Sequence, residues 1–252
     1  MYAVLQTSLE QSIDRETLEE AIMATEGLAK PDCARLQKEL FGIVTRGLSQ
    51  DDALALQAAL QARNIATEVV DESVLPVLPL PRRVRALKFV ETGIGLVDLY
   101  DHETSYEWQH IVFAAGGGLL HLRSIQEQKL KDIYMPGGYN LSTNTRPAII
   151  TAHHYDNLPE FRLELFLPVE SPRVQWVLTK DSIIIVDDSH LRLRDGAELA
   201  QLLSRLGGAL ALEQVNTGMK KVMAGEEFVY PSVHAFEEEI IWSLYQLMRG
   251  SP

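Results

Sequence analysis

The chain has 252 residues, of which 46% are apolar and 23% charged, and this is the composition and length of a folded globular protein with one or two domains. Its net charge of −12 should repel phosphate backbones and anionic lipid headgroups, which argues against binding to nucleic acid or to a membrane surface. Cys33 is the only cysteine, which excludes an intrachain disulfide and a multi-cysteine zinc site and fits a reducing compartment.

The first residues contain neither a basic segment nor a long apolar run, so we expect no signal peptide. No stretch approaches the roughly 18–20 consecutive apolar residues that a transmembrane helix needs. These features together predict a cytoplasmic protein.

Residues 1–71 are predicted to form a small β-α-α-β-α-β domain, with helices covering one side of a short sheet. Asp14 and Ser49 are placed to cap the first and last helices, and Pro31 suits the first turn of the middle helix. The predicted strands are residues 2–6, 41–47 and 65–70.

Residues 31–70 resemble the C-terminal domain of the bacterial ribosomal stalk protein, whose fold is shared with the Clp protease adaptor. The features that carry the resemblance are Asp32, Cys33 and Leu36 in one helix, Gly47-Leu48-Ser49 after a strand, Asp51-Asp52-Ala53 at the next helix start, and Leu56 and Leu60 within that helix. The resemblance implies a fold rather than a function. The stalk domain meets translation factors through a lysine-rich face, where this chain has Gln37, Gln57, Ala58 and Gln61, so that activity is not carried over.

Residues 72–84 are predicted to be an extended linker between two domains. Pro76, Pro79 and Pro81 deny the backbone both helical and sheet hydrogen bonds. The basic residues that follow it are expected to be solvated or paired with acids rather than to form a binding stripe; they are Arg82, Arg83, Arg85 and Lys88.

Residues 85–252 alternate in polarity with a period of two and are predicted to form a β-rich domain that ends in three helices. The helices are expected at 196–206, at 214–223 and from Ser232 onward. The overall fold class is therefore α+β. A run of antiparallel strands before a terminal helix is similar to pleckstrin-homology-type barrels, and residues 127–146 are expected to be an exposed loop.

Two adjacent histidines, His153 and His154, lie near Asp156 in a predicted strand. Because successive strand side chains point to opposite faces, the two imidazoles should diverge, and only His154 and Asp156 could share a face. Zinc needs at least three protein ligands, and the third would have to come from His102, His110 or His121. We therefore expect ordinary strand residues here.

Three further features suggest chemistry but have structural explanations. Gly116–Gly118 are interpreted as the turn of a hairpin, since no Gly-Lys-Ser/Thr sequence follows them. Cys33 could be a nucleophile at a helix start, yet no histidine lies nearby, so a buried thiol is favoured. Glu237–Glu239 fan out by about 100° per residue on a helix and are interpreted as a solvated face. The tryptophans Trp108, Trp176 and Trp242 are interpreted as core residues.

The sequence thus predicts no catalytic, metal-binding or cofactor-binding residue. The leading hypothesis is a non-enzymatic protein-interaction or regulatory module with an unknown protein partner. Two alternatives remain open: a metal-assisted hydrolase around His154 and Asp156 with 127–146 as its lid, and a protein that binds a small molecule or a peptide.

Overall fold

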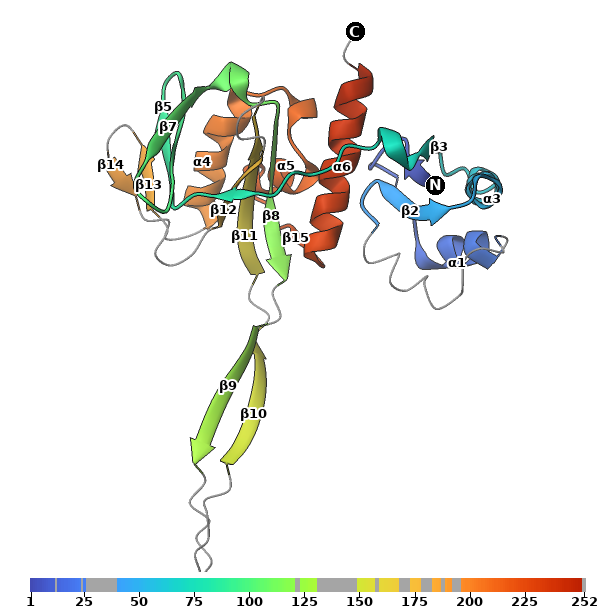
Figure 1. The fold of residues 1–252 in the computed structure, drawn as a ribbon, viewed down its shortest axis with the longest axis horizontal. Coiled ribbons are helices and arrows are strands. Elements are labelled where there is room, and N and C mark those ends of the chain that lie inside the picture. Colours follow the sequence, from blue (N-terminus) through green and yellow to red (C-terminus); the bar gives the residue numbers. More distant parts are fainter. Residues whose placement is uncertain are drawn as a thin grey trace, which may run out of the picture.

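The computed structural model mixes helices and mainly antiparallel strands, which confirms the predicted α+β class (Figure 1). It describes residues 1–11, 13–23, 25, 40–120, 123–130, 149–156, 159–167, 173–177, 183–186, 189–191 and 196–250. Among these residues, no helix combines the length and apolar character that a bilayer crossing requires.

The N-terminal part is a three-stranded antiparallel sheet with helices on one face. The strands lie in the order β2-β1-β3, and the elements are β1 (Tyr2–Gln6), α1 (Arg15–Met23), β2 (Ile43–Leu48), α3 (Gln50–Gln61) and β3 (Thr67–Asp71). The predicted caps are confirmed, since Asp14 accepts a hydrogen bond from the Thr17 N–H and Ser49 from the Asp52 N–H. The predicted helix after Pro31, including Cys33, lies outside the described residues.

The second face of this sheet packs against the last helix, α6 (Val233–Gly250). Leu5, Ile43 and Val70 of the sheet contact Tyr245 and Trp242 of that helix. Figure 1 shows α6 standing between the small sheet and the larger body of the molecule. The helix thus contributes to two hydrophobic cores.

The connecting segment 72–84 is only partly as predicted. A 3₁₀ helix occupies Glu72–Val74, and β4 (Arg82–Arg83) forms a parallel ladder with β12 (Arg173–Val177), so both ends make the hydrogen bonds that the prolines were expected to prevent. The prolines lie between these ends, where the chain runs outside helix and strand.

The described strands of the larger body form two five-stranded sheets and one separate ribbon. The sheets are ordered β15-β8-β11-β12-β4 and β14-β13-β5-β6-β7. The strands not yet bounded are β5 (Ala86–Val90), β6 (Gly93–Val97), β7 (Glu103–Glu107), β8 (Phe113–Leu120), β11 (Pro159–Phe166), β13 (Ile183–Val186), β14 (Ser189–Leu191) and β15 (Val229–Tyr230).

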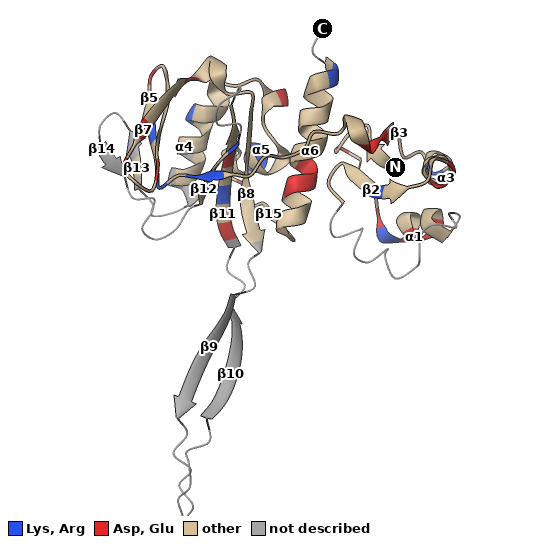
Figure 2. Cartoon of the chain, viewed as in Figure 1, with Lys and Arg blue, Asp and Glu red and all other residues tan. Residues whose placement is uncertain are grey.

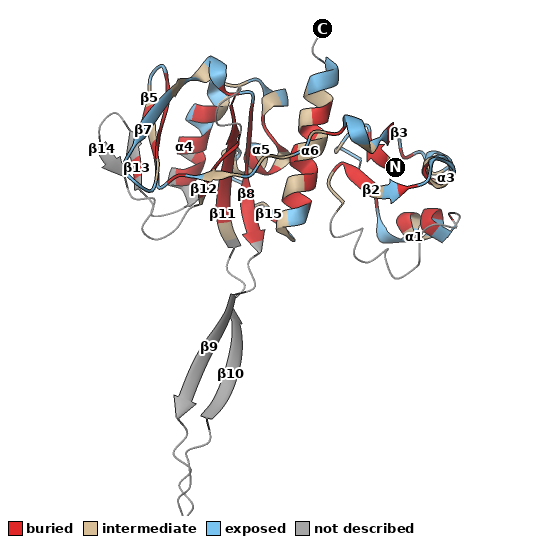
Figure 3. Cartoon of the chain, viewed as in Figure 1, coloured by how far each residue is buried: buried red, intermediate tan, exposed pale blue. Residues whose placement is uncertain are grey.

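These sheets do not close into a barrel, so the similarity to pleckstrin-homology-type barrels is wrong. Three of the described ladders are parallel (β4 with β12, β5 with β13 and β15 with β8), which a simple antiparallel meander cannot produce. Helices α4 (Gly196–Gly208) and α5 (Thr217–Met223) instead complete a core that contains Leu87, Leu163 and Trp176 (Figure 3).

The separate ribbon consists of β9 (Arg123–Leu130) and β10 (Ile149–Asp156), which pair in antiparallel register. Residues 127–130, predicted to be loop, are therefore strand, because ladder hydrogen bonds use backbone groups and need no apolar periodicity. The remainder of the predicted loop, 131–146, lies outside the described residues.

The three C-terminal helices occur where they were predicted, with shifted ends. Helix α4 continues through Gly208 instead of stopping before Gly207. Asn216 caps α5 by accepting a hydrogen bond from the Met219 N–H at 3.0 Å, and Ser232 caps α6 by accepting one from the Ala235 N–H at 3.0 Å.

Candidate functional site

Three consecutive glutamates of α6 reach three different parts of the molecule. The predicted divergence is correct, but the solvated face is wrong: Glu239 is 0% exposed and Glu238 only 6%. Figure 2 shows this acidic turn in the middle of α6. Buried carboxylates are stabilised by hydrogen bonds or cations, so each glutamate needs its own partner.

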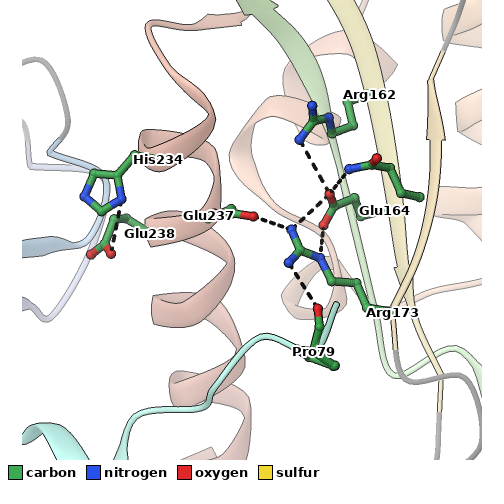
Figure 4. Close-up of polar contacts among 8 residues, drawn as sticks. Pro79, Arg162, Glu164, Arg173, His234, Glu237 and Glu238 are labelled. Carbon is green, nitrogen blue, oxygen red and sulfur yellow. Dashed lines mark hydrogen bonds and ion pairs between the residues drawn. The ribbon is translucent and has the colours of Figure 1, made fainter. Parts of the chain in front are cut away.

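Glu237 joins a buried ion network on the strands that face α6 (Figure 4). Arg173 of β12 donates from Nη2 to Glu237 Oε1 at 2.6 Å and from Nε to Glu164 Oε2 at 2.7 Å. Gln175 Nε2 donates to Glu164 Oε1 at 2.9 Å, and Arg173 Nη1 to the Pro79 carbonyl at 3.3 Å. One guanidinium therefore ties together β11, β12, α6 and the proline segment.

The charges of this network balance. Burial by itself would lower the pKa of the Arg173 guanidinium, but the hydrogen bonds and charges of Glu164 and Glu237 outweigh it and raise that pKa. Arg162 adds a second cation, with Nη1 3.9 Å from Glu164 Oε1. The Arg173 guanidinium therefore stays charged and serves as a structural joint between the two carboxylates.

Glu238 connects α6 to the N-terminal sheet. Its Oε2 accepts a hydrogen bond from Arg46 Nε at 3.2 Å, and its Oε1 lies 3.1 Å from Arg46 Nη2. His234, one turn earlier on α6, places Nδ1 3.9 Å from the same carboxylate (Figure 4). Arg46 belongs to β2, so this ion pair links two segments 192 residues apart.

Glu239 ends in a buried network with Tyr230. The carboxylate accepts the Tyr230 hydroxyl and, at 2.6 Å, the Thr217 N–H. The Tyr230 oxygen in turn accepts Asn216 Nδ2 at 2.7 Å and the Gly218 N–H at 3.1 Å. Burial first, and then the Glu239 charge, raise the pKa of Tyr230 well above its ordinary value. This phenol therefore stays protonated at neutral pH.

A cavity of about 380 Å³ adjoins this network. Its wall comes from the N-terminal part, from the segment around α5 and from α6, and it includes Leu9, Glu213, Val215, Lys220, Glu239, Trp242, Ser243 and Leu247. All of these residues except Leu9 lie between Glu213 and Gly250, and because the wall also needs Leu9 from the other end of the chain, sequence spacing gave no indication of the cavity.

The predicted histidine site is only partly covered by the structure. His153, His154 and Asp156 lie in β10, which confirms the strand, but their side chains and all of His121 lie outside the described part. His102 and His110 are exposed, and His102 Nδ1 lies 3.3 Å from Asp98. No three described His, Cys, Asp or Glu side chains are grouped to hold a metal ion. The hydrolase alternative stays a prediction.

Gly116–Gly118 do not form the predicted turn, because they lie inside β8. The reason is a close approach: a Cβ on Gly117 would lie 2.5 Å from the ring of Tyr230, and one on Gly218 would lie 2.4 Å from the Gly116 carbonyl. Small residues thus let α5 and Tyr230 reach the strand.

The prediction that the tryptophans are core residues is confirmed for Trp176, and the prediction that the basic residues after the linker are paired is confirmed for Arg85. Trp176 is 1% exposed, as expected of a core residue. Trp108 and Trp242 are half-buried, and the indole of Trp242 donates to the Gln6 carbonyl at 2.7 Å. Arg85 pairs with Asp101, so this basic residue is paired as expected.

Comparison of the chain with protein-family models, with curated proteins and with solved structures finds no match, so the resemblance of residues 31–70 to the ribosomal stalk domain stays a prediction.

Proposed function

We propose that this protein is a non-enzymatic regulatory module that binds a small amphipathic molecule in the cavity beside α6. The observation that carries the proposal is the cavity itself, whose volume of about 380 Å³ suits a small ligand. Its wall combines apolar side chains with polar and charged ones, among them Lys220, Glu239 and Ser243, so that a bound molecule would meet both kinds of surface.

The wall suggests the chemistry of the ligand. Leu9, Val215 and Leu247 would contact an apolar body. Ser243 makes no hydrogen bond through its hydroxyl, and Lys220 no ion pair, to another described residue, so both are free to bind a polar or anionic group. A ligand with an apolar body and one carboxylate or hydroxyl fits this pattern.

The position of the cavity supports a regulatory role. Trp242 forms part of its wall and also holds the N-terminal sheet through Gln6. A ligand that contacts Leu9 and α6 together would tighten the attachment of the N-terminal part, because it binds only the assembled form. Glu239, the buried acid of the wall, is engaged in internal hydrogen bonds, which favours binding over proton transfer by this carboxylate.

A thermal-shift screen of the full chain against amphipathic metabolites tests the proposal. A true ligand at 100 times its Kd adds about 2.7 kcal/mol, a rise in Tm on the order of 5–10 °C for a protein of this size. Ser243→Leu, which fills the cavity from α6, should remove the rise, whereas Met248→Leu on the exposed side of the same helix should keep it. If no compound raises Tm, or Ser243→Leu responds like the wild type, the proposal is wrong.

A further inference from the structure

The proline segment presents a regular pattern of burial with a period of three. Leu75 is 5% exposed, and Leu78 packs against the core beside α6. Val77 and Leu80, by contrast, are 91% and 93% exposed. Side chains three residues apart therefore share a direction, inward for the first pair and outward for the second.

This period is the one expected of a polyproline II backbone. Leu75 has φ −74° and ψ 138°, close to the polyproline II values of about −75° and +145°. Pro76, Pro79 and Pro81 fix their own φ near −65° and hold the residue before each of them extended. A polyproline II helix has three residues per turn, which explains why one face is buried and another exposed.

The polyproline II ribbon formed by residues 75–81 is held at both ends and in the middle. The Leu75 N–H donates to the Glu72 carbonyl at 3.1 Å, and the Val84 N–H donates to the Gln175 carbonyl at 3.0 Å. Between them, Arg173 donates to the Pro79 carbonyl at 3.3 Å, and this guanidinium is itself fixed by two carboxylates (Figure 4). A partner would therefore meet a preformed ribbon and lose little entropy in ordering it.

The exposed face has a defined chemistry. Val77 and Leu80 stand about 9 Å apart along the ribbon, given the rise of a polyproline II helix, with half-buried prolines beside them. Arg83 follows on an exposed position and makes no ion pair with a described residue. Two aliphatic side chains on a polyproline II ribbon, followed by an exposed arginine, match ligands of aromatic-lined grooves.

We propose that residues 76–83 are a docking element for a partner protein whose groove is lined with aromatic rings and bears an acidic side chain opposite Arg83. The partner covers Val77 and Leu80, while Leu75 and Leu78 anchor the ribbon from below. This surface is separate from the cavity, so the inference does not depend on the proposed function.

The test uses the full chain and a panel of purified SH3 and WW domains, which bind polyproline II ribbons through aromatic grooves. At least one domain should bind in isothermal titration. Val77→Asp and Leu80→Asp should each weaken that binding about tenfold or more, the loss expected at the centre of an interface. Leu99→Asp, at a turn residue that is also 64% exposed, is the matched control and should bind as the wild type does.

Three outcomes would overturn the inference. No domain of the panel binds the wild type; both variants bind as tightly as the wild type; or the wild type is a dimer that Leu80→Asp converts to a monomer, since a second copy would then occupy the ribbon. All three substitutions are on exposed side chains, so an unchanged Tm verifies that the fold is intact.

Discussion

Tyr230 donates its phenolic hydrogen to Glu239 in a part of the interior where both side chains are fully buried. The same oxygen accepts hydrogen bonds from Asn216 and from the Gly218 backbone. Asn216 Oδ1 in turn accepts the Gly116 N–H at 2.8 Å. A single hydroxyl thereby joins β15, α6, the start of α5 and β8.

Tyr230→Phe should therefore destabilise the protein strongly. The substitution leaves the Asn216 amide, the Gly218 N–H and one oxygen of Glu239 without a partner. A buried polar group that loses its hydrogen bond costs about 1–3 kcal/mol, and we expect a total loss of about 2–4 kcal/mol in urea denaturation. Tyr106→Phe is the control, since the Tyr106 hydroxyl makes no hydrogen bond with a described residue. Equal losses in the two variants would contradict the role of the network.

The same tyrosine should make stability fall at alkaline pH. Burial and the Glu239 charge raise the pKa of Tyr230, so the native state holds the phenolic proton more tightly than the unfolded chain, where the pKa is near 10. Above about pH 10 the unfolded state loses this proton first, and the unfolding free energy decreases by at most about 1.4 kcal/mol per pH unit for this group. Below that pH the contribution is fully present.

Urea denaturation between pH 9 and 11 measures this slope. Tyr230→Phe should show a shallower decline than the wild type. Burial also raises the pKa of Tyr245, with Glu68 adding to the effect, so part of the slope should persist until Tyr245→Phe is added. An unchanged slope in Tyr230→Phe would show that the phenol does not titrate as described.

Arg173→Met should lower the free energy of unfolding by more than the loss of the Arg173 hydrogen bonds alone would. It leaves Glu164, which is 0% exposed, charged and without its main cation. Removing one partner of a buried pair costs about 3–5 kcal/mol, whereas removing both charges is often tolerated. The double variant Arg173→Met with Glu164→Gln should therefore be more stable than Arg173→Met alone in the same denaturation assay. If the double variant is less stable than Arg173→Met, the role of the Arg173 guanidinium is not to compensate the charge of Glu164.

Local patterns in the sequence predicted the parts of the fold that depend on neighbouring residues. Ser49 and Ser232 cap helices as expected, and the strands expected at residues 86–92 and 95–101 occur at Ala86–Val90 and Gly93–Val97. Glu237–Glu239 and Gly116–Gly118 were misinterpreted because their roles depend on distant partners: Arg173 is 64 residues from Glu237, and Tyr230 lies more than 100 residues from the glycines. The cavity could not be predicted for the same reason.

Gly42 and Gly47 provide a matched pair that tests how α6 holds the N-terminal sheet. Both have positive φ, +85° and +78°, where any other residue is strained by about 1–2 kcal/mol. They differ in surroundings: a Cβ on Gly42 would lie 2.4 Å from the Trp242 ring, whereas nothing lies within 4 Å of one on Gly47.

Gly47→Ala should therefore lower the free energy of unfolding by the backbone strain alone. Gly42→Ala should lower it clearly more, because Trp242 must also move away from its hydrogen bond to Gln6. Trp242 lies against the N-terminal core, and α6 also packs on the larger body. The two parts should therefore unfold together, and fluorescence and far-UV circular dichroism should report one common urea midpoint in each variant. Equal losses would mean that the indole adapts freely. A fluorescence midpoint below the circular-dichroism midpoint would mean that the N-terminal sheet detaches from α6 before the remainder unfolds.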